Sequence, residues 1–270
     1  VLVPANELSR TYAFIQTHRS FSIVLGAGLG GFLVEKFGTS TALLIDAGTF
    51  FVVGVFGVTL RNERKPDLGS FSKRESVQGF KRIFTAPVLI ASIVLLAAFN
   101  MAAGVNEVLG VFLITDTLHG TASQYGLVFS ALGVSMLITG FALSRIQIRF
   151  RDTHALVISA LISASGMFMY GLSPNVGAAM AAFAINGIGL TGLHVFGTPI
   201  IIRHTSEAER GRVFAASSSI TTAGTLLSTG IAGSLGQLFP IRLVITCSAI
   251  TCGILALLAG ASIVRTERKT

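Results

Sequence analysis

Eight long apolar segments restrict the folds that this sequence can adopt. They contain 18 to 26 residues each, and about 20 apolar residues let an α-helix cross the hydrocarbon core of a bilayer. Only helices satisfy their own backbone hydrogen bonds in lipid without closing a barrel, and these segments are too long and uniformly apolar for barrel strands. The expected helices cover residues 9–34, 41–60, 88–113, 125–143, 155–172, 178–202, 213–238 and 243–264.

The composition agrees with a membrane location. Hydrophobic residues make up 51% of the chain and charged residues only 12%, whereas a soluble domain carries about 25% charge. The net charge of +8 by itself suggests a nucleic-acid partner. Its basic residues, however, lie in short connections between apolar segments. We therefore predict an all-α, polytopic membrane protein that contacts the lipid bilayer and has no nucleic-acid partner.

Basic residues lie almost entirely in alternate connections. Of the 20 Lys and Arg, 17 lie at the two ends of the chain and in every second connection between the apolar segments. The other connections contain only Lys36 and Arg242, and Arg19 lies inside the first segment. Basic loops stay in the cytoplasm, so both ends of this chain are predicted to be cytoplasmic. The 17 residues are Arg10, Arg61, Arg64, Lys65, Lys73, Arg74, Lys81, Arg82, Arg145, Arg149, Arg151, Arg203, Arg210, Arg212, Arg265, Arg268 and Lys269.

The longest polar interval, residues 61–87, divides the apolar segments into two before it and six after it. Transporters are often built from repeated helical halves, so this layout predicts two bundles. Residues 1–60 would be the last two helices of the first bundle, 61–87 a cytoplasmic central loop, and 88–270 a complete six-helix second bundle. The chain is then expected to be a fragment. Within the loop, Val77, Phe80 and Phe84 have helical spacing, which fits either a short surface helix or a plain linker.

A glycine-rich run, GAGLGG, lies inside the first segment. Gly26, Gly28 and Gly31 match the GxGxxG pattern of dinucleotide-binding folds, but that pattern requires a preceding strand and a helix that opens at the glycines. An apolar segment surrounds it here instead. We predict close helix packing, with Gly26 and Gly30 letting a neighbouring backbone approach.

The stretch VLGAGLGGFLVEKFG resembles motif C on the fifth helix of major facilitator superfamily exporters. Gly26, Gly30 and Gly31 match, and Ala27 stands where that family usually has Pro. The stretches LVPANELSRTYAF, LLIDAGTFF and SEAERGRVFA resemble the bacterial branch of macrolide-efflux and siderophore-export proteins. The resemblance implies helices 5–12 of a monomeric transporter in the bacterial plasma membrane. It also implies small-molecule substrates and protons as partners, with the proton gradient as energy source and no cofactor.

Among the polar residues inside the segments, Glu107 is the leading candidate for proton coupling. It shares a helical stripe with Asn100 and Gly104, and a carboxylate in a partly desolvated cavity can take up and release a proton during transport. The alternative places Glu107 near the outer membrane surface, simply solvated.

Arg19 and Asp46 are further candidates in the first two segments. Arg19 either lines the substrate path, holds an acidic partner, or extends toward the cytoplasmic interface. Asp46 is expected to hydrogen-bond a helix end or a neighbouring helix rather than to carry protons. In the sixth segment, Asn186 and His194 accompany several glycines and Pro199, which fits either a bendable helix lining the cavity or tight packing alone.

No catalytic set stands out, and we expect neither an enzyme nor a metal site. The sequence contains no GxSxG and no Walker A motif, and no histidine has Cys or acidic partners at metal-ligand spacing. Cys247 and Cys252 lie in one apolar segment and are expected to be buried thiols.

The leading hypothesis is a proton-driven exporter of lipophilic small molecules that works by alternating access. One alternative keeps the fold but imports a polar metabolite or acts as a uniporter, which the Ala27 departure from the motif permits. Another is a membrane-embedded interaction or sensor protein, or a truncated product, without transport.

Overall fold

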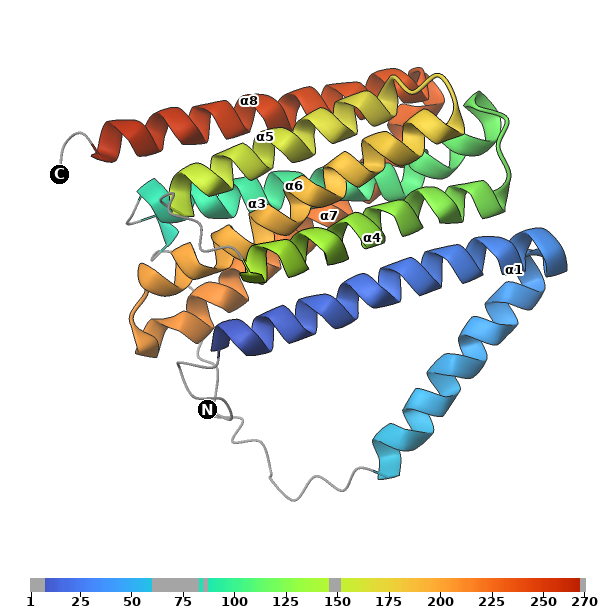
Figure 1. Ribbon diagram of the computed structural model, residues 1–270, viewed down its shortest axis with the longest axis horizontal. Coiled ribbons are helices and arrows are strands. Elements are labelled where there is room, and N and C mark those ends of the chain that lie inside the picture. The colour runs from blue at the N-terminus through green and yellow to red at the C-terminus, as the bar shows by residue number, and fades with distance from the viewer. Residues whose placement is uncertain (1–7, 60–82, 85–86, 146–151, 268–270) are drawn as a thin grey trace.

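The computed structural model describes residues 8–59, 83–84, 87–145 and 152–267, and within these ranges it is helical, with no strand. Figure 1 shows long helices lying roughly side by side, with the N- and C-termini at the same end of the bundle. The fold class predicted from the sequence is confirmed. The elements are α1 (Leu8–Thr59), α3 (Pro87–Phe112), the π-helical turn η1 (Leu113–Thr117), α4 (Ala122–Arg145), α5 (Asp152–Gly171), α6 (Val176–Arg203), α7 (Glu207–Leu238) and α8 (Ile241–Glu267).

Helix α1 contains both of the first two predicted segments. Its two arms meet at Gly38, whose φ of 80° and ψ of 161° lie outside the helical region. A positive φ has little steric cost for glycine because it lacks a Cβ. The short polar connection expected between the first two segments, at residues 35–40, contains this break. The chain is helical on both sides of it, so the break is confined to Gly38.

Six stretches of the described residues are long and apolar enough to cross a membrane. One of them, Ser20–Gly57, contains both arms of α1. The 32-residue helix α7 is long enough but is not among the six. Its many Ser and Thr residues lower its hydropathy, although we predicted a spanning helix over 213–238. The six stretches are Ser20–Gly57, Pro87–Thr117, Ala122–Arg145, Thr153–Gly171, Val176–Arg203 and Ile241–Ser262.

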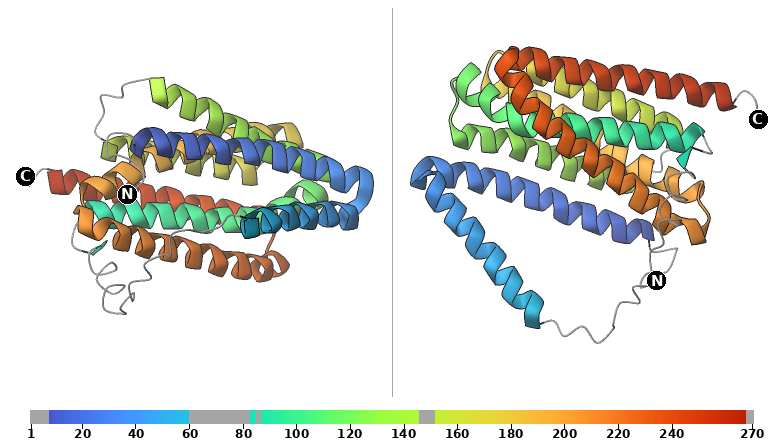
Figure 2. Two further views of the ribbon diagram at one scale, coloured as in Figure 1. Left: turned by 90° about the horizontal axis from the view of Figure 1, so that it is seen from below. Right: turned by 180° about the vertical axis from the view of Figure 1, so that it is seen from behind.

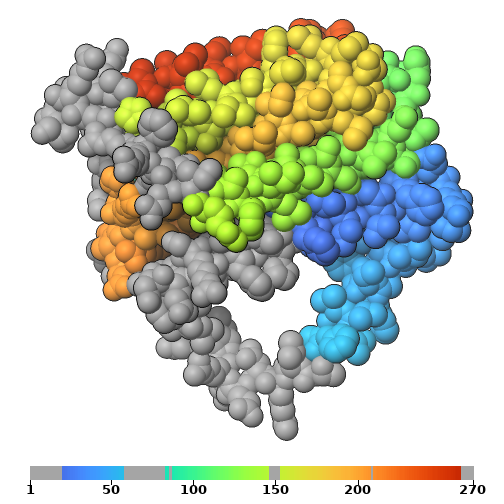
Figure 3. Space-filling model, viewed as in Figure 1, coloured from blue at the N-terminus to red at the C-terminus, as the bar shows by residue number. Residues whose placement is uncertain are grey.

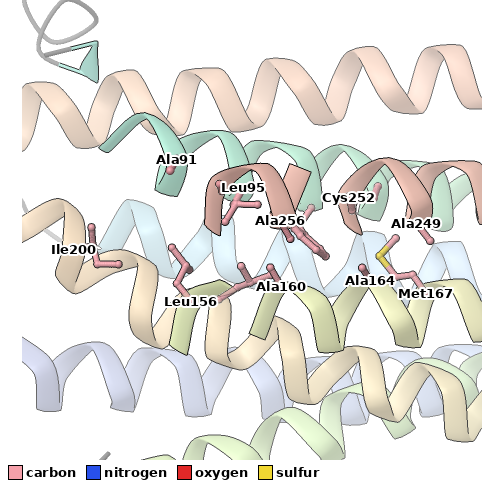
Figure 4. Close-up of a cluster of buried hydrophobic side chains, with 14 residues drawn as sticks. Ala91, Leu95, Leu156, Ala160, Ala164, Met167, Ile200, Ala249, Cys252 and Ala256 are labelled. Atoms are coloured by element: carbon pink, nitrogen blue, oxygen red, sulfur yellow. The ribbon is translucent and has the colours of Figure 1, made fainter. Parts of the chain in front are cut away.

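A core of small and branched side chains joins α3, α5, α6 and α8 (Figure 4). Ala160 and Ala256 are fully buried there, next to Leu95 and Leu156. Alanines let helix axes approach closely, and in lipid such packing replaces the hydrophobic effect as the force between helices. Cys252 belongs to this core, but Cys247 is exposed, so the prediction that both thiols are buried is wrong for Cys247.

The first arm of α1 packs along α4, which places it at one side of the bundle (Figures 1 and 2). The second arm turns away at Gly38 and stands clear of the helices from α3 onward (Figure 3). Its large apolar side chains, such as Leu44, Phe50 and Phe51, are more than 70% exposed. This amount of exposed apolar surface fits a segment that lipid or further protein covers.

Candidate functional site

Glu107 lies on α3 and its side chain is exposed. The π turn η1 continues α3, so the helical stretch runs without interruption from Pro87 to Thr117 and contains 31 residues. At 1.5 Å per residue this stretch is about 46 Å long, and Glu107 lies about 8 Å from its middle. The sequence-based alternative put Glu107 near the outer surface because it lies about 20 residues, roughly 30 Å, past Pro87. The helix begins at Pro87 in the structure as well, so both interpretations of Glu107 stay open.

The rest of the predicted stripe on α3 faces α7. Gly104 is buried, and a Cβ there would collide with the hydroxyl of Ser228 and lie only 2.9 Å from the Thr229 hydroxyl. The Asn100 amide donates a hydrogen bond to the Leu96 carbonyl within its own helix (2.7 Å). The Thr225 hydroxyl of α7 donates to the Asn100 carbonyl at 3.4 Å, so Asn100 and Gly104 form part of the α3–α7 contact. Glu107 is the exposed member of the stripe.

Two tyrosines contact α3 just beyond Glu107. The buried Tyr170 hydroxyl of α5 donates to the Gly110 carbonyl at 3.4 Å. Tyr125 of α4 is half-buried; its ring would lie 3.7 Å from a Cβ on Gly110, and it is close enough to Glu107 to interact with its charge. Tyr125 is therefore near Glu107, and α7 packs against α3 one turn earlier, at Gly104.

The contact between α1 and α4 is built from small residues. A Cβ on Gly31 would lie 2.5 Å from the Ala122 carbonyl oxygen and 3.1 Å from the Gly126 Cα, and one on Gly126 would collide with the Ala27 carbonyl. Nothing lies within 4 Å of a Cβ built on Gly26 or Gly30. The predicted close approach at Gly26 and Gly30 therefore differs from the structure, because helical rotation turns these residues away from α4. Gly31, with Ala27 four residues before it, faces that helix.

The amino end of α4 receives a carboxylate from α1. Glu35 Oε2 accepts hydrogen bonds from the Thr121 hydroxyl (2.7 Å) and from the Ser123 backbone N–H (3.0 Å). Thr121 and Gln124 form a reciprocal capping box: the Thr121 N–H donates to Gln124 Oε1 (3.0 Å), and the Gln124 N–H donates to the Thr121 hydroxyl (3.3 Å). Sequence reasoning missed this feature, although the spacing of Thr121 and Gln124 was a readable signal for it.

The remaining predicted site residues are spread over the molecule. Asn186 of α6 is buried and accepts a hydrogen bond from the Ser163 hydroxyl of α5 (2.6 Å), which places it in a helix contact. His194 is half-buried on α6, and Asp46 is exposed on the second arm of α1. Arg19 lies in the first arm, but its side chain falls outside the part of the chain that the structure describes, as does the loop of residues 60–82. Within the described residues, no group of three His, Cys, Asp or Glu could hold a metal ion.

Helix α6 owes its position to glycines. A Cβ on Gly189 would lie 2.5 Å from the Ser159 carbonyl, and one on Gly187 would lie 2.7 Å from the Leu132 carbonyl of α4. The helix continues through Pro199 to Arg203. The glycines of this segment, for which both gating and packing were open, therefore make close contacts with α4 and α5.

Comparison with protein families identifies the fold. The sequence profile of the Major Facilitator Superfamily matches residues 2–113 and 95–270, which together cover nearly the whole chain. The chain belongs to the Major Facilitator Superfamily. A comparison with curated proteins finds no match.

As a member of this superfamily, the protein is a multi-pass membrane transporter. A transporter moves a solute without making or breaking covalent bonds, so its intramembrane groups serve to bind, to exchange protons and to let helices slide or part. Among the described residues, Glu107 is an exposed carboxylate within one of the apolar stretches, and α1 meets α4 through glycines and a polar end.

Proposed function

We propose that this transporter exports lipophilic small molecules and is driven by the proton gradient through alternating access. In this mechanism two bundles rock about a site near the middle of the membrane. The observation that carries the proposal is the position of Glu107, exposed on α3 about 8 Å from the middle of a 31-residue helical stretch. Charged side chains at such depth are costly and are usually kept for function.

Glu107 would act by changing its protonation state. Protonated, the carboxyl is neutral and tolerates a closed, dry environment; ionised, it requires water or a positive partner. When the cavity opens toward the more acidic side the group takes up a proton, and it releases that proton on the other side. Tyr125 lies close enough to be affected by the charge of the ionised form.

The orientation in the membrane follows from charge. The last turns of α4 and α6 and the first turns of α7 lie at one end of the bundle (Figure 1). Arg145 and Arg203 belong to the last turns, and Arg210 and Arg212 lie near the start of α7. Positive residues favour the cytoplasmic side. We therefore propose that this end faces the cytoplasm of a bacterial cell and that the protein acts as a monomer in the plasma membrane.

Substrate-dependent proton movement tests the proposal. Inverted vesicles containing the full-length protein are given a pH gradient, and lipophilic antibiotics and dyes are added while a fluorescent probe follows the gradient. Partial collapse of the gradient when a compound is added is the expected result. The variant Glu107→Gln keeps the shape of the side chain but cannot ionise, and should abolish the response.

Glu207→Gln is the matched control. Glu207 lies in the first turn of α7, and its side chain is 86% exposed. Removing its charge should leave the proton movement unchanged. Proton-coupled transport that survives Glu107→Gln would remove this carboxylate from the mechanism.

A second function has a specific observation in its favour. Helix α7 exposes the hydroxyl-bearing side chains of Ser218, Ser219 and Thr222, and hydroxyl groups suit a polar solute better than a lipophilic one. In this alternative the same fold imports a polar metabolite or works as a uniporter. Saturable inward uptake of a sugar or an organic acid, with no response to lipophilic compounds, would favour it.

A further inference from the structure

We propose that Glu35 is a latch that holds α1 to α4 at the end of the bundle opposite the termini, and that it must release each time the transporter opens at that end. This inference rests on the proposed alternating-access function, in which α1 and α4 belong to different halves. It concerns one carboxylate, which sequence reasoning passed over, and the capped end of one helix.

The contacts at Glu35 span the two helices. Its Oε2 accepts from both the Thr121 hydroxyl and the Ser123 N–H, residues separated from it by more than 85 positions in the chain. The first backbone N–H groups of a helix have no partner within the helix, and the helix dipole gives this end a partial positive charge. A carboxylate from another helix satisfies both needs, and the hydrogen bonds to it are charge-assisted.

The nearby charged groups, Lys36 and Asp116, interact with residues other than Glu35. The neighbouring Lys36 directs its ammonium over the rings of Phe32 and Phe37, 5.5 and 5.6 Å from their centroids. The Asp116 carboxylate at the end of η1 accepts from its neighbour Thr115 at 2.6 Å. Within the described residues, Glu35 therefore supplies the carboxylate that hydrogen-bonds across the α1–α4 contact at this end.

Below the latch, the contact between the helices is close but weakly bonded. Small residues meet from Ala27 and Gly31 on one side to Gly126 on the other, and the Ser130 hydroxyl donates to the Val24 carbonyl at 2.9 Å. Glycine contacts separate without breaking strong bonds, because they hold by packing alone. The hydrogen bonds at Glu35 thus lie at the end of the α1–α4 contact (the seam, Val24 to Gly31 on α1), which is otherwise held mainly by packing.

Thiol labelling measures how often this seam opens. In the full-length protein, Cys247→Ser and Cys252→Ala remove the two thiols of residues 1–270, and any other cysteine is replaced by serine. Ser130→Cys places a reporter under the contact, where Ser130 is half-buried against α1. A small water-soluble methanethiosulfonate reacts faster when α1 and α4 separate, so a change in the labelling rate between variants reports a change in the open population. No substrate and no proton gradient are needed.

Glu35→Ala should raise the labelling rate about fivefold, the effect of losing a typical helix cap. Glu35→Gln, which keeps an acceptor but not the charge, should give a smaller increase. Lys36→Gln is the matched control, because it changes the charge at the same end without touching α4, and should label at the parent rate. Equal rates for Glu35→Ala and the parent, or an equal increase in Lys36→Gln, would overturn the latch.

The result is separable from the exporter proposal. A parent protein that shows no proton movement, but whose labelling rate depends on Glu35, keeps the latch and loses the exporter. Proton-coupled export together with labelling rates that do not depend on Glu35 keeps the exporter and loses the latch.

Discussion

Two adjacent glycines of α1, Gly30 and Gly31, allow a direct test of the α1–α4 contact. A Cβ on Gly31 would lie 2.5 Å from the Ala122 carbonyl oxygen, whereas nothing lies within 4 Å of a Cβ on Gly30. A glycine-to-alanine substitution therefore places its methyl group against the α4 backbone at Gly31 and in open space at Gly30. Both changes add one methyl group and the same gain in helix propensity, so the difference between them isolates the contact.

The magnitude follows from the geometry. An ordinary contact begins near 3.4 Å, so Gly31→Ala requires α1 and α4 to move apart locally by about 0.9 Å. The Ala122 oxygen belongs to the backbone and cannot rotate away. Overpacking of this kind costs about 1–3 kcal/mol, against a gain of about 0.5–1 kcal/mol from replacing a helical glycine. The net loss for Gly31→Ala is about 1–2 kcal/mol, and Gly30→Ala should be neutral or slightly stabilising.

The assay is thermal unfolding of the purified protein in detergent, with the two variants side by side. Because both variants gain the same helix propensity, they differ by the packing cost of about 1–3 kcal/mol. A loss of 1 kcal/mol lowers Tm by about 2–4 °C in a chain of this size class, so Gly31→Ala should melt about 2–12 °C below Gly30→Ala. Equal melting temperatures for the two variants would refute the close approach of Gly31 to α4.

Two further outcomes follow from the buried contacts. Asn186→Ala and Ser163→Ala should each lower the free energy of unfolding by about 1 kcal/mol. The double variant should lose clearly less than the sum of the two, because the two residues share one buried hydrogen bond. Melting temperatures of the parent and the three variants check this, and strict additivity would contradict it. A membrane-permeant maleimide should label the exposed Cys247 and leave the buried Cys252 unreacted in the folded protein. Mass spectrometry of the labelled protein distinguishes the two cysteines. Equal labelling would contradict the burial of Cys252.

Much of the fold was predictable because apolar length is a strong signal. Six of the eight predicted segments correspond to separate helices from α3 to α8, and the fold class follows from them. The polarity of α7 did not prevent its prediction, since its apolar and small residues still form a long uninterrupted run. The joint at Gly38 was harder to predict, because whether a glycine ends a helix or only bends it depends on the surrounding packing.

The candidate site was less predictable, because residue type does not tell which neighbouring helix a side chain faces. The sequence identified Gly26, Gly30 and Gly31 together as motif C-like packing residues, and only the three-dimensional contact with α4 distinguishes Gly31 from the other two. Glu107 was identified because an acidic residue stands out in an apolar run. Glu35 was not, because its partner Thr121 is 86 residues away and no local pattern joins them.

Gly38 gives the second arm of α1 mechanical leverage. The arm runs over residues 39–59, so it is about 31 Å long. A rotation of about 10° at one residue would displace the far end of this rod by about 5 Å, although no bond elsewhere in the helix changes. Small torsional adjustments at a single glycine are therefore amplified into movements as large as one helical turn.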